Sequence, residues 1–538
     1  MLVHTIDKKL VLLIFAFFFI INLVTSGGHL DWWDGIEAFL VTESMVLKNT
    51  AKLDPSVPSV EKLGFNVNYT VYANKAIQSG NNSNFKMTPQ EPVYTVRSIL
   101  LSAIAIPFYH AGLFFSNTPI TSIGLFANSL FISLTAIVIF CISVELNRST
   151  KLAFALGLVF SVCSFVWPYN TTFWVQPLQG LLLISSMFFL VKARHHNGSF
   201  LCDYTFLRTR SKRFFLYGTA GVLYGISVFA HPASLIFLPA FTLYSYFSDT
   251  KRKGFILFAS FLCVTLFFVT LTNYYRFGSF TEFGYGQFSS LATHNGWKGI
   301  LGLLLSPGAG LLFYFPLSVL LPLAARNFYY ENKVLFISCG YIIVSSWLYY
   351  GTLSFGAEPI AWSGGVAWGP RYLVPVLPFI MILLGSMLQH LRKKYFLKIL
   401  AVSLCVVGFY VNMTGVLLWF QYGLTYGWDK QALADHPNSL EVMTWNPIYS
   451  PIVLHTKALI EDYPSSLDPT RYHNTAWNWI AYGTAPCSFD LYLYCTYGIG
   501  PVLGIFFVLA VLAVIIFKKL NLSTGHYVKY ISRATATP

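Results

Sequence analysis

The sequence predicts an all-α polytopic membrane protein with about 12 transmembrane helices. Of the 538 residues, 55% are hydrophobic and only 10% are charged, whereas a soluble domain carries roughly 25% charged residues. The mean hydropathy of the chain is +0.58. Apolar runs long enough to cross a bilayer recur along the whole chain. Together these observations exclude an ordinary soluble protein.

Each predicted span is an apolar run bounded by polar residues. The runs lie at 10–26, 119–144, 152–169, 175–192, 214–230, 232–248, 255–273, 300–324, 334–352, 372–389, 398–420 and 500–517. The first run follows Lys8 and Lys9 and has the length of a signal peptide. We expect a retained helix instead, because cleavage would fall within a few residues of the acidic cluster that starts at Asp31.

Basic residues are concentrated in the short loops between these spans. With both termini in the cytoplasm, most of the 35 Lys and Arg residues lie inside and most of the 21 acidic residues lie outside. This distribution follows the positive-inside rule. The net charge of +14 therefore reflects membrane orientation and does not indicate a nucleic-acid partner. We expect a multi-pass protein of a prokaryotic cell membrane, surrounded by membrane lipid.

Two outer segments are long enough to fold outside the membrane. The first, 27–96, precedes an apolar stretch at 97–115 that contains Pro107. Counting that stretch as a span would reverse the orientation of every later basic loop, so we predict an interfacial or re-entrant helix. The second outer segment is rich in Trp and Tyr. The predicted organisation is a membrane domain over 1–420, an extracytoplasmic segment at 421–499, a last span at 500–517 and a basic cytoplasmic tail at 518–538.

Three carboxylates follow the first span at a spacing of three residues. If Asp31, Asp34 and Glu37 are helical, they share one face. Carboxylates beside a membrane are costly to desolvate, which makes this cluster the first candidate for chemistry. One of them would act as a general base. The trio could also hold a divalent cation, although the proposed chemistry requires no cofactor. A helix cap or a salt bridge is the structural alternative for Asp34.

Two outward-facing arginines are candidates for binding phosphate. Arg276 follows one predicted span and Arg371 opens another, so both are expected at the depth of lipid phosphates. A guanidinium group binds phosphate through a planar fork of donors. Carboxylates facing these arginines would suit transfer of a group from a phospholipid-like donor. The alternative is that each arginine only reaches toward lipid headgroups.

The remaining polar signals are weaker. Cys487 and Cys495 both lie in the last outer segment, where a disulfide can persist. No Cys or His spacing indicates zinc, and no metal site is expected. The loop Ser306–Gly310 interrupts an apolar run, which indicates either a cavity wall or a simple kink.

Several short motifs resemble a known family when taken in order. They are Asp34-Gly35, Ile106-Pro107-Phe108-Tyr109, Trp167-Pro168-Tyr169, Phe173-Trp174-Val175-Gln176-Pro177-Leu178, Leu305-Ser306-Pro307-Gly308 and the segment 368–378. Over roughly residues 10–420 the chain resembles the GT-C glycosyltransferases, in the group of protein-mannosyltransferase-like and aminoarabinose-transferase-like enzymes.

The resemblance implies a specific reaction. Such enzymes transfer a sugar from a polyprenyl- or dolichyl-phosphate carrier to a protein, lipid or glycan acceptor on the outer side of the membrane. An acidic residue in the first outer loop serves as the base, and this role falls on Asp34, with Asp31 or Glu37 in support. Arg276 and Arg371 would contact the donor phosphate, and His231 would assist at the cavity.

Three positions depart from the family pattern and keep two alternatives open. Gln176 replaces an acidic residue, His231 replaces an arginine before a proline, and Ala309 replaces an arginine after Ser-Pro-Gly. These departures favour a GT-C scaffold that binds lipid without turnover. A flippase or transporter of a lipid-linked solute is the other alternative. It would need charged residues deep within several spans, and the predicted spans carry almost none.

Overall fold

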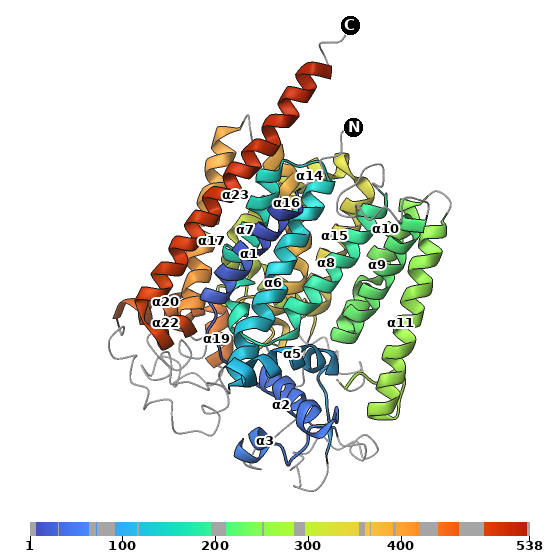
Figure 1. Cartoon of the computed structure of the whole chain (residues 1–538), viewed down its shortest axis with the longest axis vertical. Helices are drawn as coiled ribbons and strands as arrows, with labels where there is room; N and C mark the ends of the chain where they lie inside the picture. Colours follow the sequence, from blue (N-terminus) through green and yellow to red (C-terminus); the bar gives the residue numbers. More distant parts are fainter. Residues whose placement is uncertain are drawn as a thin grey trace.

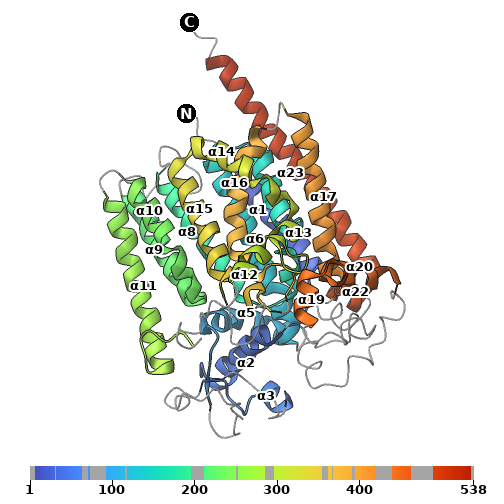
Figure 2. The same cartoon turned by 180° about the vertical axis from the view of Figure 1, so that it is seen from behind.

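A computed structural model describes most of the chain, and the fold is a bundle of helices (Figures 1 and 2). The described residues are 7–30, 32–63, 71–72, 92–115, 118–194, 211–249, 252–284, 296–353, 361–365, 367–390, 394–418, 439–461 and 489–534. The β-strands among them are β1 (Val71–Tyr72) and β2 (Tyr94–Thr95), which pair antiparallel. Each strand has only two residues, and all the other described elements are helices. The predicted all-α class is therefore confirmed.

Within the described residues, eight helices are long and apolar enough to cross a membrane. They are α6 (Pro119–Glu145), α8 (Val175–Arg194), α9 (Ser211–Ala230), α11 (Lys253–Phe277), α15 (Lys333–Gly351), α16 (Leu377–His390) with the 3-10 turn Arg371–Val376 before it, α17 (Tyr395–Leu417) and α23 (Ile499–Ala534). Each matches one predicted span. The total of 12 crossings stays a prediction, because the other four predicted runs form shorter or interrupted helices.

Three of those four runs are mostly helical in the structure. The first becomes α1 (Lys8–Val24). The second becomes α7 (Thr150–Val162), followed by the 3-10 turn Trp167–Thr171. The third is the 3-10 turn Pro232–Phe237 leading into α10 (Leu238–Ser248). Proline at the start of both later turns fits this geometry, since its missing N–H is not needed there.

The core lies where α1, α6, α7, α8 and α16 pack together. Phe17 and Phe18 of α1 meet Phe154 of α7 with ring centroids 5.6 Å apart. The apolar window of α6 is 72% buried, whereas that of α23 is only 17% buried. Since α23 is the more hydrophobic of the two, its exposed face is suited to lipid. Helix α1 begins and α23 ends at the same end of the bundle (Figure 1).

The opposite end of the bundle carries the first outer segment. Helix α2 (Trp32–Lys48), the short α3 (Pro58–Leu63) and α5 (Ile99–Phe115) lie there, and α2 and α5 run across the bundle rather than along it (Figure 1). Helix α5 packs against α2, α6 and α9, and continues through Pro107. This orientation supports the interfacial helix predicted at 97–115.

The fourth run, predicted as a span at 300–324, does not form one continuous helix. It is divided into α12 (Gly296–Leu305), α13 (Leu311–Tyr314), the 3-10 turn Pro316–Leu320 and α14 (Leu321–Glu331). The break falls at Ser306–Gly310, where the Gly308 amide donates to the Thr444 carbonyl at 3.0 Å. A Cβ atom on Gly308 would collide with the Met443 carbonyl. The break therefore provides a docking point for α19 (Ser439–Trp445).

The last outer segment makes a second contact with the bundle, through α20. After α19 come the 3-10 turn Pro447–Tyr449, α20 (Pro451–Glu461) and α22 (Tyr492–Tyr497). His455 of α20 is fully buried, with its ring centroid 4.7 Å from that of Trp368. These contacts place the segment 439–461 against the bundle end that carries α2.

Candidate active site

Asp34 is positioned by the start of α2. It lies in the first turn of that helix, where a carboxylate interacts favourably with the helix dipole. The next residue, Gly35, packs so closely that a Cβ atom there would lie 3.2 Å from the Phe173 carbonyl oxygen. Glycine at 35 therefore allows α2 to approach the link before α8, which carries Trp174.

Asp34 bridges two arginines from distant parts of the chain. Its Oδ1 forms an ion pair with Nη2 of Arg97, and its Oδ2 accepts a hydrogen bond from Nη2 of Arg371. The Asp34 side chain is 14% exposed and that of Arg371 is 10% exposed. The structure thus contains the salt bridge considered as an alternative for Asp34, and adds a second arginine to it.

Arg371 is held by the residues around it. Its guanidinium lies 3.9 Å from the ring centroid of Trp174, in cation–π geometry. Trp174 is buried and meets Tyr169 edge to face at 5.3 Å. Gly364 packs against the Arg371 Cβ and has a left-handed φ of 92°, which suits glycine.

Glu37 joins the cluster through Arg97. The Glu37 Oε2 lies 3.5 Å from Nε of Arg97, one turn along α2 from Asp34. Burial raises the pKa of Glu37 to about 6, and the nearby Asp34 charge adds to this effect while Arg97 opposes it. Asp31 lies outside the described residues, so the predicted trio is seen as the pair Asp34 and Glu37.

Charges fix the protonation state of the site near neutral pH. Burial would raise the pKa of Asp34, but the Arg371 and Arg97 guanidinium groups outweigh it and hold that pKa below its usual value. Burial and the same two arginines lower the pKa of His231 to about 4. The site therefore contains an ionised Asp34, two arginines and a neutral imidazole. His231 also caps the turn Pro232–Phe237, its Nδ1 accepting from the Ala233 amide at 3.3 Å.

Arg276 supports the segment that carries Arg97. Its buried Nη2 donates to the carbonyl oxygens of Thr95 at 2.6 Å and Arg97 at 2.7 Å. Thr95 belongs to the short strand β2 (Tyr94–Thr95) and lies two residues before Arg97. The role of Arg276 as a ligand of the donor phosphate stays a prediction, and the contacts described here give it a positioning role.

Sequence reasoning missed two members of the site, Arg97 and Trp174. Arg97 is the only charged residue at the start of the predicted interfacial stretch, which is a signal that could have marked it. Trp174 lies directly before the predicted span at 175–192. Of the residues that depart from the family pattern, Gln176 and Ala309 are both buried. No group of three or more His, Cys, Asp or Glu side chains that could hold a metal is found in the described part of the chain.

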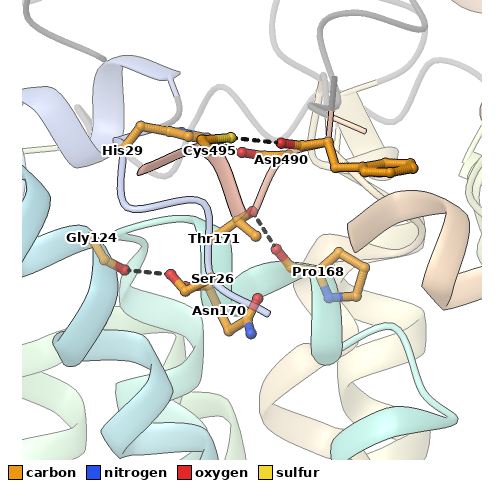
Figure 3. A network of polar contacts seen from close by, with 9 residues as sticks. Ser26, His29, Gly124, Pro168, Asn170, Thr171, Asp490 and Cys495 are labelled. Atoms are coloured by element: carbon orange, nitrogen blue, oxygen red, sulfur yellow. Dashed lines mark hydrogen bonds and ion pairs between the residues drawn. The ribbon is translucent and has the colours of Figure 1, made fainter. Parts of the chain in front are cut away.

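The link between α1 and α2 is clasped by the end of the last outer segment (Figure 3). His29 Nε2 lies 2.6 Å from Asp490 Oδ1, and both side chains are buried. The Tyr492 amide donates to the Ser26 carbonyl at 3.0 Å. The Ser26 hydroxyl in turn donates to the Gly124 carbonyl of α6 at 3.1 Å. This clasp fixes the chain five residues before Asp34.

Cys495 lies beside this clasp and is disulfide-bonded. Its Sγ is 3.1 Å from the Phe489 carbonyl oxygen. The predicted partner, Cys487, lies outside the described residues, so the pairing of these two cysteines stays a prediction. Cys141, Cys163, Cys263, Cys339 and Cys405 are free.

The fold and the site define a polytopic all-α membrane protein with a charged cluster at one end of its helix bundle. No family model and no curated protein matches the chain. It is similar to the solved structures of ArnT from Cupriavidus metallidurans in the apo state and bound to undecaprenyl phosphate. The identities are 13% and 12%, with 86% of this chain and 79% of ArnT covered at a TM-score of 0.45.

The chain is also similar to the apo oligosaccharyltransferase of Archaeoglobus fulgidus. That identity is 9%, with 80% of this chain and 58% of the other covered at a TM-score of 0.43. At this level of similarity, the chemistry and the site residues of this chain rest on its own geometry.

Proposed function

We propose that this protein is a membrane glycosyltransferase that moves a sugar from a polyprenyl- or dolichyl-phosphate donor to an acceptor hydroxyl. The observation that carries the proposal is an aspartate bridged by Arg97 and Arg371 at the end of the bundle where interfacial helices meet the spans. A lipid-linked phosphate would reach this depth without leaving the membrane. Its charge would be met by two guanidinium groups, which suit phosphate geometry.

The site residues can divide the reaction between them. The Asp34 carboxylate would take the proton of the acceptor hydroxyl, whose oxygen attacks the anomeric carbon of the sugar. The bond from that carbon to the phosphate oxygen breaks, and its electron pair leaves with the phosphate. Arg371 and Arg97 would stabilise the charge that develops there. Attack opposite the leaving group inverts the anomeric configuration.

The remaining predicted residues would act around this centre. Glu37 would balance the charge of Arg97, and the neutral His231 would offer a hydrogen bond rather than a charge. Arg276 would hold the Arg97 segment in place. With the termini in the cytoplasm, as the basic loops predict, the reaction takes place on the extracytoplasmic side.

One observation favours a second candidate, a scaffold that binds lipid phosphate without turnover. Both oxygens of Asp34 are engaged by arginines, as they would be in a purely structural ion pair.

A measurement of sugar transfer distinguishes the enzyme from the scaffold. Purified protein in lipid nanodiscs would be supplied with a panel of undecaprenyl- and dolichyl-phosphate sugars, with membrane extracts as the source of acceptor.

An enzyme is expected to release the polyprenyl phosphate and to transfer labelled sugar from at least one donor in the panel. Binding of polyprenyl phosphate with no transfer from any donor would assign the scaffold function. The lipid-linked sugar that accumulates in cells lacking the protein identifies the donor to include.

A further inference from the structure

We propose that Arg97 is an exchangeable partner of Asp34. In this account the phosphate of the donor takes over the Arg97 guanidinium, and the loss of that partner frees Asp34 Oδ1 to act as the base. The inference rests on the proposed function and adds a coupling between donor binding and activation of the base.

An exchange would make Asp34 a stronger base. An ionised carboxylate only accepts hydrogen bonds, and here each oxygen already faces a guanidinium nitrogen. A general base must come within about 2.6–3.2 Å of the proton it removes. Each oxygen keeps a second lone pair, but the positive charge beside it weakens its attraction for a proton. Loss of one arginine would give an acceptor hydroxyl more room at Asp34 and would raise the proton affinity of the carboxylate.

The surroundings of the two arginines indicate which one moves. Arg371 is 10% exposed, and its guanidinium lies on the buried Trp174 ring. Arg97 is 31% exposed, and its second carboxylate contact, from Nε to Glu37, is a looser 3.5 Å. Arg371 is thus the more buried of the two and is stacked on an aromatic ring, whereas the Arg97 side chain is partly open to solvent.

The backbone of Arg97 is anchored independently of its side chain. Its carbonyl oxygen accepts from Arg276 Nη2 at 2.7 Å, and the Thr95 carbonyl accepts from the same nitrogen. The side chain can therefore change partners without displacing the segment 94–97. Phosphate offers Arg97 two parallel hydrogen bonds, compared with the contact of its Nη2 with Asp34 Oδ1.

The exchange predicts competition between Asp34 and phosphate for Arg97. Binding of undecaprenyl phosphate in nanodiscs would be measured for the wild type, Asp34→Asn, Arg97→Gln and the double variant. We expect Asp34→Asn to bind undecaprenyl phosphate more tightly by about tenfold, within the 5–150-fold range usual for coupled sites. In the Arg97→Gln background, Asp34→Asn should bring little or no gain.

Three results would overturn the proposal. They are no tightening in Asp34→Asn, weaker binding in Asp34→Asn, and the same gain in the Arg97→Gln background, which would assign the effect to Arg371. Asp54→Asn is the matched control, because Asp54 lies beyond α2 and bonds to Ser56. Thermal unfolding of each variant verifies that it is folded, and Asp34→Ser replaces Asp34→Asn if the latter is not.

The binding measurements test the exchange of Arg97, and the transfer assay tests the glycosyltransferase activity, so one proposal can be refuted without the other. Transfer by the wild type, with no tightening in Asp34→Asn, would remove the exchange and leave the glycosyltransferase. Tightening that requires Arg97, with no transfer from any donor, would support the exchange at a phosphate site and remove the enzyme.

Discussion

At the scale of single residues, the site is governed by competition between burial and opposite charge. Two unit charges 4 Å apart interact by roughly 4 kcal/mol at an effective dielectric constant of 20. Asp34 has two such partners and stays ionised, with its pKa below the usual value. Glu37 is as deeply placed, but its one arginine lies farther away and its pKa rises to about 6. Asp34 and Glu37 therefore differ in proton affinity.

This difference predicts a pH-dependent contribution of Glu37 to stability. A carboxyl whose pKa rises from 4.5 to about 6 on folding costs no stability at low pH and costs about 2 kcal/mol once both states are ionised. The wild type should therefore lose thermal stability relative to Glu37→Gln between pH 4.5 and pH 6. Unfolding temperatures of both proteins across this window test it, and a constant difference between them would contradict it.

Sequence alone could reach only part of the site. The carboxylates stood out because acidic residues are rare in this chain, and Arg371 because it opens a span. Their contact could not be predicted, because Asp34 and Arg371 are 337 residues apart. Arg97 escaped notice because a single arginine before an interfacial helix is ordinarily a headgroup contact.

At the scale of elements, the site depends on how the ends of separate helices are held together. Helix α2 supplies Asp34 and Glu37, the turn before α16 supplies Arg371, and the segment before α5 supplies Arg97. Arg276, at the end of α11, joins the last of these to the bundle. Hydropathy located α5, α11 and α16, but helix ends are set by caps, turns and hydrogen bonds that hydropathy does not report.

The positioning role of Arg276 predicts that its effect depends on Arg97. Arg276→Ala should weaken undecaprenyl phosphate binding by about tenfold in the wild type, since a hydrogen bond to a charged group contributes about 1.5–3 kcal/mol. In the Arg97→Gln background the same change should have little effect, because the segment then carries no ligand to position. If Arg276 bound the phosphate directly, the two losses would add.

Arg276→Lys provides the conservative comparison for this cycle. Lysine keeps the charge and three N–H donors on a different side-chain geometry. A lysine that restored binding fully would show that a cationic donor at position 276 is sufficient, and a lysine that did not would show that the position of Nη2 matters.

At the scale of the whole molecule, segments from the N-terminal and C-terminal parts of the chain pack together. Helix α1 packs against α23, and the segment before α22 meets the link between α1 and α2. The fold class and the interfacial stretch at 97–115 were predictable, because hydropathy and charge distribution act over long windows. The docking of 439–461 and 489–492 onto the bundle was not, because an outer segment leaves no periodic apolar signal to read.

The buried pair of His29 and Asp490 predicts a strong effect on stability. Leaving a buried hydrogen-bonding group without this contact costs about 1–3 kcal/mol. We therefore expect Asp490→Asn to lower the unfolding temperature clearly. Asp54→Asn, a substitution of the same type in the other outer segment, should leave that temperature nearly unchanged. Equal stability of the two variants would show that the clasp contributes little.

If Asp34 is the base of a sugar transfer, removing its carboxylate must slow the chemical step of that transfer. The rate of transfer in a single turnover, with donor saturating, measures this step apart from binding. Asp34→Asn should transfer sugar at least about 100-fold more slowly than the wild type, the lower end of the range for general base catalysis. Asp54→Asn should match the wild type. Full activity in a folded Asp34→Asn variant would contradict the account.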